Sequence, residues 1–228
     1  TTSPTVAGGE GEVKRESAIT FELANAAVIT IAHFIAASRQ VLKDAKQLRG
    51  YIDTRLEYGL KLEEENELLN SAGTSGELNG LRNQQTAFAY SQTNQTDLDT
   101  ILRAFLQVSL SYYEASAVIL HPTDWAGIML SKDTTGRYLF SDPHSLEAPR
   151  VWGKLVLPTP SMPANSFQCG AYDMAAGIYD NEQVSIRMSD QHADFFTRNL
   201  VAILCEERLA LALYRAAAIV GGTLTHGQ

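Results

Sequence analysis

The spacing of apolar positions changes within the first seventy residues. The run from Val28 to Ile35 is β-branched and apolar, which is typical of a buried strand. Beyond it, apolar residues recur every three or four positions, the period of a helix with one buried face. These positions are Val41, Ala45, Leu48, Ile52, Leu56 and Leu60. They predict a helix of about 40 Å, beginning near Asp44, where Asp44 and Gln47 resemble a capping box, and ending at Asn70 before Gly73.

The rest of the chain mixes shorter helices with strands. A helix is expected from about Thr96 to Glu114, with four apolar side chains directed inward: Leu98, Ile101, Leu102 and Phe105. A second is expected to be capped by Thr123 and to run to Leu130. The predicted strands are Ala117 to Leu120, Trp152 to Leu157, Ser166 to Ala171, Val184 to Met188 and Leu200 to Tyr214. Because helices and strands do not alternate regularly, the pattern indicates an α+β fold.

Composition limits the function. The chain has 228 residues and a net charge of −8, which argues against binding nucleic acid through a positive surface. Cys169 and Cys205 lie in apolar surroundings and are typical of reduced core cysteines in a cytosolic protein. The longest uncharged run, Leu155 to Tyr172, contains three prolines and would not form a membrane-spanning helix.

Motifs for enzymatic chemistry are absent from the sequence. It has no Walker A, dinucleotide-binding or zinc-protease motif, and its five histidines lack metal-ligand spacing. Gly73, Gly76 and Gly80 follow a predicted helix, so they are not expected to hold a phosphate. We therefore expect no cofactor and no metal. The charged positions near the end of the long helix are interpreted as a solvated face; they are Lys61, Glu63, Glu64, Glu65 and Glu67.

A charged triplet interrupts the most apolar strand near the C-terminus. Glu206, Glu207 and Arg208 stand in the middle of the run from Asn199 to Arg215. Burying an unpaired carboxylate is costly in free energy, so these side chains must find partners, face water or meet another subunit.

Several segments, in this order and spacing, resemble the major capsid proteins of tailed bacteriophages of the Hong Kong phage type. They are Ile29 to Leu60, the glycine-rich segment ending at Leu81, H-P-T-D-W from His121, K-D-T-T-G-R-Y from Lys132, W-G-K-L-V-L-P-T-P from Trp152, and the C-terminal run. The resemblance implies an α+β capsid fold with a long spine helix, a peripheral lobe, an axial lobe and an extended hairpin called the E-loop.

The resemblance also implies an organisation and a role. Residues 1–20 would belong to the E-loop, 21–76 and 176–211 to the peripheral (P) domain, and 77–175 and 212–228 to the axial (A) domain. Copies of the chain would assemble into hexamers and pentamers of an icosahedral shell that encloses double-stranded DNA without reading its sequence. Family members carry an N-terminal arm and an outgoing E-loop strand upstream, so we expect this sequence to be a trimmed piece. A scaffold domain and a maturation protease are further partners that the resemblance allows, and the virion capsid, made in the bacterial cytoplasm, is the expected location.

Some proteins of this family join their subunits by a Lys–Asn isopeptide bond, promoted by a Glu of a third subunit. By motif, the resemblance assigns Lys14 in V-K-R-E-S as the lysine, Asn199 in F-F-T-R-N as the acceptor and Glu206 in C-E-E-R as the promoting carboxylate. A lysine with the ordinary pKa of about 10.4 is only about 0.04% neutral at pH 7, so the reaction needs a group that accepts its proton. Arg15 departs from the pattern, since a proline is expected there.

Other interpretations remain open at this point. Lys14 can be a solvated loop lysine, Asn199 a connector between helix and strand, and Glu206 the partner of Arg208 or Arg187. An encapsulin-like compartment shell would share the fold. From a different class, a cytosolic α+β enzyme could use Glu206, Glu207 and His192.

Overall fold

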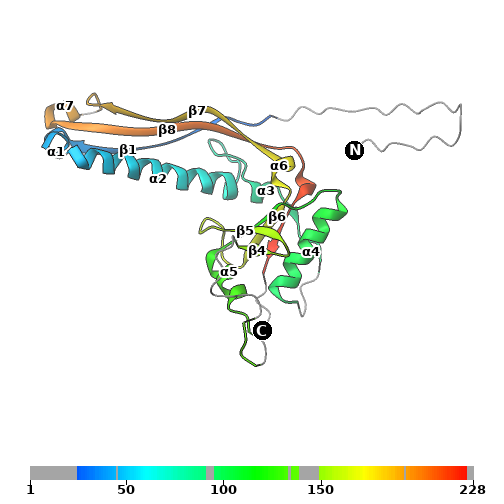
Figure 1. Cartoon of the computed structure of the whole chain (residues 1–228). Coiled ribbons are helices and arrows are strands. Elements are labelled where there is room, and N and C mark those ends of the chain that lie inside the picture. The colour runs from blue at the N-terminus through cyan, green and yellow to red at the C-terminus, as the bar shows by residue number, and fades with distance from the viewer. Residues whose placement is uncertain are drawn as a thin grey trace, which may run out of the picture.

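The computed structural model describes residues 25–44, 46–90, 95–132, 135–138, 149–192 and 194–224. Their strands form two separate sheets, of three and of six strands. Figure 1 shows a long, thin layer that contains the first sheet and the longest helix, and below one end of it a more compact unit that contains the second sheet. The mixture of helices with largely antiparallel sheets confirms the α+β prediction.

The long layer is built on an antiparallel sheet with strand order β1-β8-β7. These strands are β1 (Ile29–Ser38), β7 (Ala176–Ser189) and β8 (Leu200–Leu213). The helices of this layer are α1 (Arg39–Asp44), α2 (Lys46–Asn70) and α7 (Phe195–Arg198). The predicted long helix is therefore present as α2. It begins at Lys46 after the short α1, and it ends at Asn70, the predicted residue.

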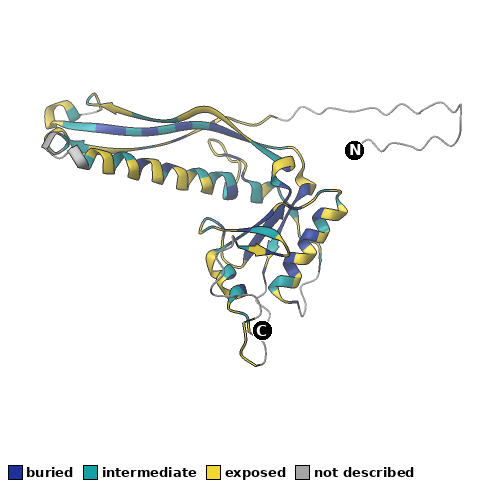
Figure 2. Ribbon diagram, in the orientation of Figure 1, coloured by how far each residue is buried: buried dark blue, intermediate teal, exposed yellow. Residues whose placement is uncertain are grey.

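Alternation along β8 explains why this layer is stable. Successive strand residues point to opposite faces of a sheet, and the odd-numbered residues Ile203, Cys205 and Leu209 are buried. They belong to one apolar cluster with Leu56 and Leu60 of α2. The helix thus covers one face of the sheet. Figure 2 shows that the side of the helix that points away from the sheet is largely exposed.

The compact unit contains a mixed sheet with strand order β2-β9-β6-β3-β5-β4. Its strands are β2 (Thr86–Ala87), β3 (Ala117–Leu120), β4 (Arg150–Val151), β5 (Lys154–Pro158), β6 (Ser166–Gly170) and β9 (Ile219–Thr223). Its helical elements are α3 (Leu81–Gln84), α4 (Asp97–Leu110), α5 (Pro122–Met129), α6 (Tyr172–Ala175) and the 3₁₀ turn η1 (Ala216–Ala218). Pairs β3–β5 and β2–β9 are parallel, and the others are antiparallel.

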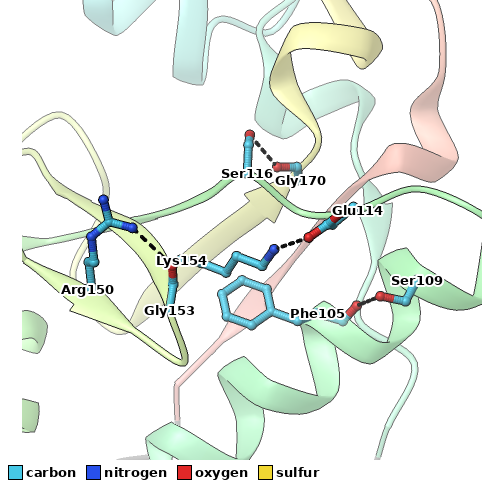
Figure 3. Close-up of polar contacts among 8 residues, drawn as sticks. All are labelled: Phe105, Ser109, Glu114, Ser116, Arg150, Gly153, Lys154 and Gly170. Atoms are coloured by element: carbon cyan, nitrogen blue, oxygen red, sulfur yellow. Dashed lines mark hydrogen bonds and ion pairs between the residues drawn. The ribbon is translucent and has the colours of Figure 1, made fainter.

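Helix α4 packs on this sheet through Ile101, Phe105 and Val108, which share a core with Val118 and Phe167. Polar contacts also connect the strands and the helix of this region, as Figure 3 shows. The Lys154 side chain of β5 extends toward the segment that follows α4, where its Nζ lies 2.6 Å from Glu114 Oε1. Ser116 Oγ donates to the carbonyl oxygen of Gly170 at 3.1 Å, which joins the start of β3 to β6.

Two details of α4 differ from the prediction. The helix ends at Leu110 rather than near Glu114. Its buried stripe passes through Ile101, Phe105 and Val108 and leaves Leu102 on the outer side, 43% exposed, so the inward assignment of Leu102 is wrong. Apolar identity alone did not reveal which flank of the stripe meets the sheet.

Local turn chemistry corrects two further boundaries. Trp152 and Gly153 both have positive φ, 50° and 78°, and form the two-residue turn between β4 and β5, so the strand predicted from Trp152 starts at Lys154. The cap of α5 is His121, whose side chain accepts a hydrogen bond from the Thr123 backbone N–H. Pro122 then occupies the first helical position, which suits a residue without an N–H.

The acidic end of α2 is not the uniformly solvated face that the sequence predicted. Glu64 is half-buried on the side toward β7 and β8, and Glu65 accepts a hydrogen bond from Thr159 of the compact unit. Glu67 Oε2 accepts from the backbone N–H of Leu78 at 3.2 Å. The chain folds back over this end of the helix, so these three carboxylates lie against other parts of the molecule, although Glu65 remains exposed to water.

Both cysteines are buried and free. Burial raises the pKa of the Cys169 thiol to about 12, which keeps it protonated and unreactive. No helix in the described ranges has the length and apolar character needed to cross a membrane.

Candidate functional site on the open face of the sheet

Asn199 lies at the junction between α7 and β8. It is the residue that ends α7, with φ 54° and ψ 36° in the left-handed region, which asparagine tolerates better than most residues. Its backbone carbonyl accepts a hydrogen bond from the Arg39 N–H at 2.9 Å, so the junction is tied to the start of α1. The residue is exposed, which leaves its carboxamide accessible at one end of the long layer.

Glu206 lies in the middle of β8 on the face opposite α2. Its carboxylate pairs with Arg187 of the neighbouring strand β7, with Arg187 Nη1 3.1 Å from Glu206 Oε1. The Glu206 side chain is 19% exposed and that of Arg187 is 67% exposed. The ion pair predicted as one structural role of Glu206 is therefore present, and the pair is open to water on one side.

An open groove of about 500 Å³ lies on the same face, next to this ion pair. Phe34 of β1 and Leu204 of β8 supply its apolar floor, and Arg187 borders it. The complete lining is Phe34, Arg187, Met188, Ser189, Gln191, His192, Ala202 and Leu204. Phe34 is 53% exposed although it is a large apolar residue in a sheet, so this surface lacks a cover in the described part of the chain.

The structure places two of the three sequence-predicted residues, and it keeps these two apart. Lys14 lies outside the described residues. Asn199 and Glu206 are seven positions apart along an extended strand, which corresponds to about 23 Å at about 3.3 Å per residue. A bond between Lys14 and Asn199 with help from Glu206 would therefore need residues of different copies.

Glu207 faces the other way from Glu206. It is 6% exposed, on the α2 side of the sheet between the buried residues Cys205 and Leu209. Burial, followed by the nearby carboxylates of Glu64 and Asp180, raises its pKa to about 7, although Lys61 acts in the opposite direction. The two adjacent glutamates thus belong to opposite faces and different surroundings.

This separation argues against the enzyme interpretation, in which Glu206, Glu207 and His192 act together. His192 follows the end of β7, where its ring contacts Phe34 and Phe195. Ser189 pairs with Ala202, which is about 13 Å from Glu206 along the strand. The three side chains therefore do not converge. In the described ranges, no group of three or more His, Cys, Asp or Glu side chains is arranged to hold a metal ion.

Sequence reasoning missed the groove and the inner carboxylates. A signal for the groove was present in Phe34, an aromatic residue whose strand position alternates with the apolar positions Ile29 and Ile31, which are buried. A signal that a carboxylate would be buried against α2 was the presence of two adjacent glutamates, Glu206 and Glu207, in one strand. In an alternating strand one of two neighbours must face the helix, but the sequence did not show which one.

The comparisons with known proteins agree with this fold. The phage capsid family matches residues 1–224 of the chain. The major capsid protein of Enterobacteria phage HK97 is 44% identical over 221 residues, which cover 96% of this chain and 57% of that protein. Similar solved structures include Gordonia phage Cozz, at a TM-score of 0.77 and 16% identity, covering 99% of this chain and 79% of that one. The capsid of the native GTA particle has a TM-score of 0.74 at 16% identity and covers 95% and 80% of the two chains.

The long helix on a three-stranded sheet, joined to a compact mixed-sheet unit, is thus the fold of phage capsid subunits. The chain belongs to the phage capsid family. It spans a little over half the length of the HK97 protein that it matches.

Proposed function

We propose that this chain is the shell-forming part of a major capsid protein, which assembles with copies of itself into hexamers and pentamers around double-stranded DNA in a virion. The observation that carries the proposal is the 44% identity to a phage major capsid protein along nearly the whole chain. The exposed apolar face around Phe34 and Leu204 supports it, since such a surface suits contact with another subunit. A compartment shell would have the same fold, but the sequence identity favours the phage capsid.

The two-unit architecture supports a division into P and A domains. Residues 21–76 and 176–211 would form the P domain, which would hold the β1-β8-β7 sheet and α2. Residues 77–175 and 212–228 would form the A domain around the six-stranded sheet. Residues 1–20 would supply part of the E-loop. In this arrangement the long layer presents its open face to neighbouring subunits.

We further propose that assembled copies join covalently. The Nζ of Lys14 would attack the side-chain carbonyl carbon of Asn199 in another copy. The new C–N bond would replace the bond to the amide nitrogen, which would leave as ammonia. Glu206 of a third copy would accept one proton of the lysine ammonium and return it to the leaving nitrogen, so that the carboxylate would be regenerated. The second proton that the lysine nitrogen loses would go to the departing ammonia, which would become ammonium.

The geometry supports this role for Glu206 over a role for Glu207. Glu206 lies on the open face, beside a groove with an apolar floor, where a lysine from another copy would be partly shielded from water. That shielding favours the neutral amine, which is the nucleophile. An approaching lysine would compete with Arg187 for the same carboxylate. Glu207, under α2, would be out of reach.

The test is to produce the complete gene product, with its maturation protease if it has one, and to examine it by electron microscopy. Closed particles are expected. Particles that have matured should give a ladder of linked chains on a denaturing gel, and mass mapping should find a Lys14–Asn199 peptide with the mass of one ammonia lost.

Glu206→Gln should assemble but lose the ladder. The matched control is Glu182→Gln, which removes a carboxylate of the adjacent strand that pairs with Arg208 at 3.7 Å, and the ladder should persist. If no closed particles form, the shell proposal is wrong. If particles form but all chains run as monomers, only the crosslinking proposal is wrong. A full ladder in Glu206→Gln would remove Glu206 from the reaction.

A further inference from the structure

Glu207 is a buried acidic side chain that lacks a complete set of partners. It is 6% exposed and sits on the inner face of β8. Its Oε1 is buried without a hydrogen-bond partner. A charged carboxylate in such a position loses its hydration without gaining equivalent hydrogen bonds, and this disfavours the packed state.

The elements packed around Glu207 bring mainly negative charge to it. Helix α2 contributes Glu64 and Lys61, and strand β7 contributes Asp180, which shares the inner face because it pairs with Leu209. Strand β1 places the apolar Ile31 directly opposite Glu207. The charged neighbours of Glu207 are thus two carboxylates, Glu64 and Asp180, and one exposed lysine, Lys61.

The other charged and titratable groups nearby lie further along the layer or on the opposite face of the sheet. His33, the next inner-face residue of β1, has its Nε2 3.0 Å from the carbonyl oxygen of Leu56. Asp53 and Glu57 of α2 lie further along the helix, near Cys205. On the opposite face of the sheet, Glu206 pairs with Arg187, and Arg208 pairs with Glu182.

Lys61 lowers the pKa values of Glu207 and Glu64, but the causes that raise them are stronger. Burial is the main cause that raises the pKa of Glu207 to about 7, followed by Glu64 and Asp180. Burial and Asp180 also raise the pKa of Glu64. Close to neutral pH, a proton on Glu207 removes both the desolvation penalty and the repulsion from its two acidic neighbours.

We propose that Glu207, together with Glu64 and Asp180, makes the packing of α2 on the β1-β8-β7 sheet depend on protonation: the helix packs firmly when Glu207 is neutral and more weakly when it is charged. The three carboxyl groups lie between α2 and the sheet that this helix covers. A change at this contact therefore acts on the whole long layer, independently of the proposed crosslinking on the opposite face.

The sign follows from proton linkage. The folded chain holds the Glu207 proton up to a pH of about 7, whereas the unfolded chain releases it near the ordinary value of 4.5. Between these values the folded state binds more protons, so its stability falls as the pH rises. The effect is absent below about 4.5, develops across this window and is complete above about 7.

The experiment compares the wild-type chain, Glu207→Gln and Glu63→Gln. Glu63 is an exposed carboxylate of the same helix and serves as the control. Urea midpoints are measured from pH 4.5 to 8.5, and amide hydrogen exchange of α2 is measured at both ends, corrected for the intrinsic pH dependence of exchange. The wild type and Glu63→Gln should lose stability and protection of α2 as the pH rises. Glu207→Gln should show a clearly smaller loss and should exceed the wild type at pH 8.5.

A direct titration does not depend on the variant being folded. In the wild-type chain, NMR of ¹³C-labelled glutamate carboxyl groups should show Glu207 titrating above pH 6. A carboxyl that titrates near 4.5 would overturn the proposal. Equal pH dependence in a folded Glu207→Gln and the wild type would also overturn it.

Discussion

Gly80 illustrates how close packing selects a single residue. Its backbone angles, φ −63° and ψ 156°, are available to any amino acid. A β-carbon there would lie 2.6 Å from the backbone nitrogen of Ser71 and 2.9 Å from the carbonyl oxygens of Leu69 and Ser71. Glycine is required here by space, because the segment after α2 turns back against the end of the helix.

Gly80→Ala should therefore destabilise the protein, by about 1–3 kcal/mol, the usual range for overpacking when neighbours must move. The neighbours here are backbone atoms, which shift less easily than side-chain tips. Gly127→Ala in α5 is the control, because a β-carbon there meets nothing within 4 Å and alanine favours a helix. Urea denaturation of both variants at one pH measures the difference. Equal stabilities would contradict the packing argument.

At the scale of elements, α4 shows how local interactions define a boundary. Thr96 and Asp99 form a complete capping box, in which each side chain accepts a hydrogen bond from the other's backbone N–H, at 3.3 and 3.1 Å. The hydrogen bonds from Thr96 lower the pKa of Asp99. The helix carries the residues that cover the six-stranded sheet, so its start also positions part of that core.

Thr96→Ala should destabilise the folded chain by about 1 kcal/mol, as is usual for the loss of a helix cap. Thr54→Ala is the control, because Thr54 is an exposed threonine within α2 whose hydroxyl bonds only to the carbonyl of Gly50, and the change should have little effect. Because the pKa of Asp99 is lowered in the folded state, its carboxylate stabilises the fold at pH values above its ordinary pKa of 3.8. This stabilisation is lost as the pH falls through the lowered pKa. The wild-type advantage over Thr96→Ala should hence shrink below about pH 3.8, measurable by urea titrations at pH 3 and pH 6. A pH-independent difference would contradict the linkage to Asp99.

At the scale of the whole molecule, polar contacts join the long layer to the compact unit. Asn70, the last residue of α2, donates to the carbonyl oxygen of Ser161 at 2.7 Å and accepts from Arg82 at 2.9 Å. Its amide also donates to Asn66 within the helix at 2.9 Å. Since the two sheets share no strand, contacts of this kind determine how firmly the units hold their relative orientation.

Asn70→Ala should weaken the coupling between the two units and cost about 1–3 kcal/mol, because it removes two hydrogen bonds between segments distant in sequence. Asn66→Ala is the matched control, since it removes only the bond within the helix. Calorimetry should show a broadened or split transition for Asn70→Ala and a single transition for Asn66→Ala. An unchanged single transition in Asn70→Ala would contradict the coupling role.

Elements with long and regular apolar patterns could be predicted from the sequence alone. The stripe from Leu48 to Leu60 repeats often enough to specify α2. Strands β3 and β8 could be placed because apolar residues dominate them, in β8 on both sides of its charged triplet. The family and the α+β class also followed from the sequence. The division into P and A domains and the roles of Lys14 and Asn199 stay predictions.

Properties that depend on residues distant in the chain could be assigned only once the fold was known. Whether Leu102 is buried depends on where the sheet lies, and the burial of Glu64 depends on how β7 and β8 pack against α2. The strongest case is the pair Glu206 and Glu207. Both are glutamates in one strand, yet one pairs with arginine on an open face and the other is enclosed beside two carboxylates. Strand alternation requires the two to differ, but only the position of the helix determines which carboxylate is buried.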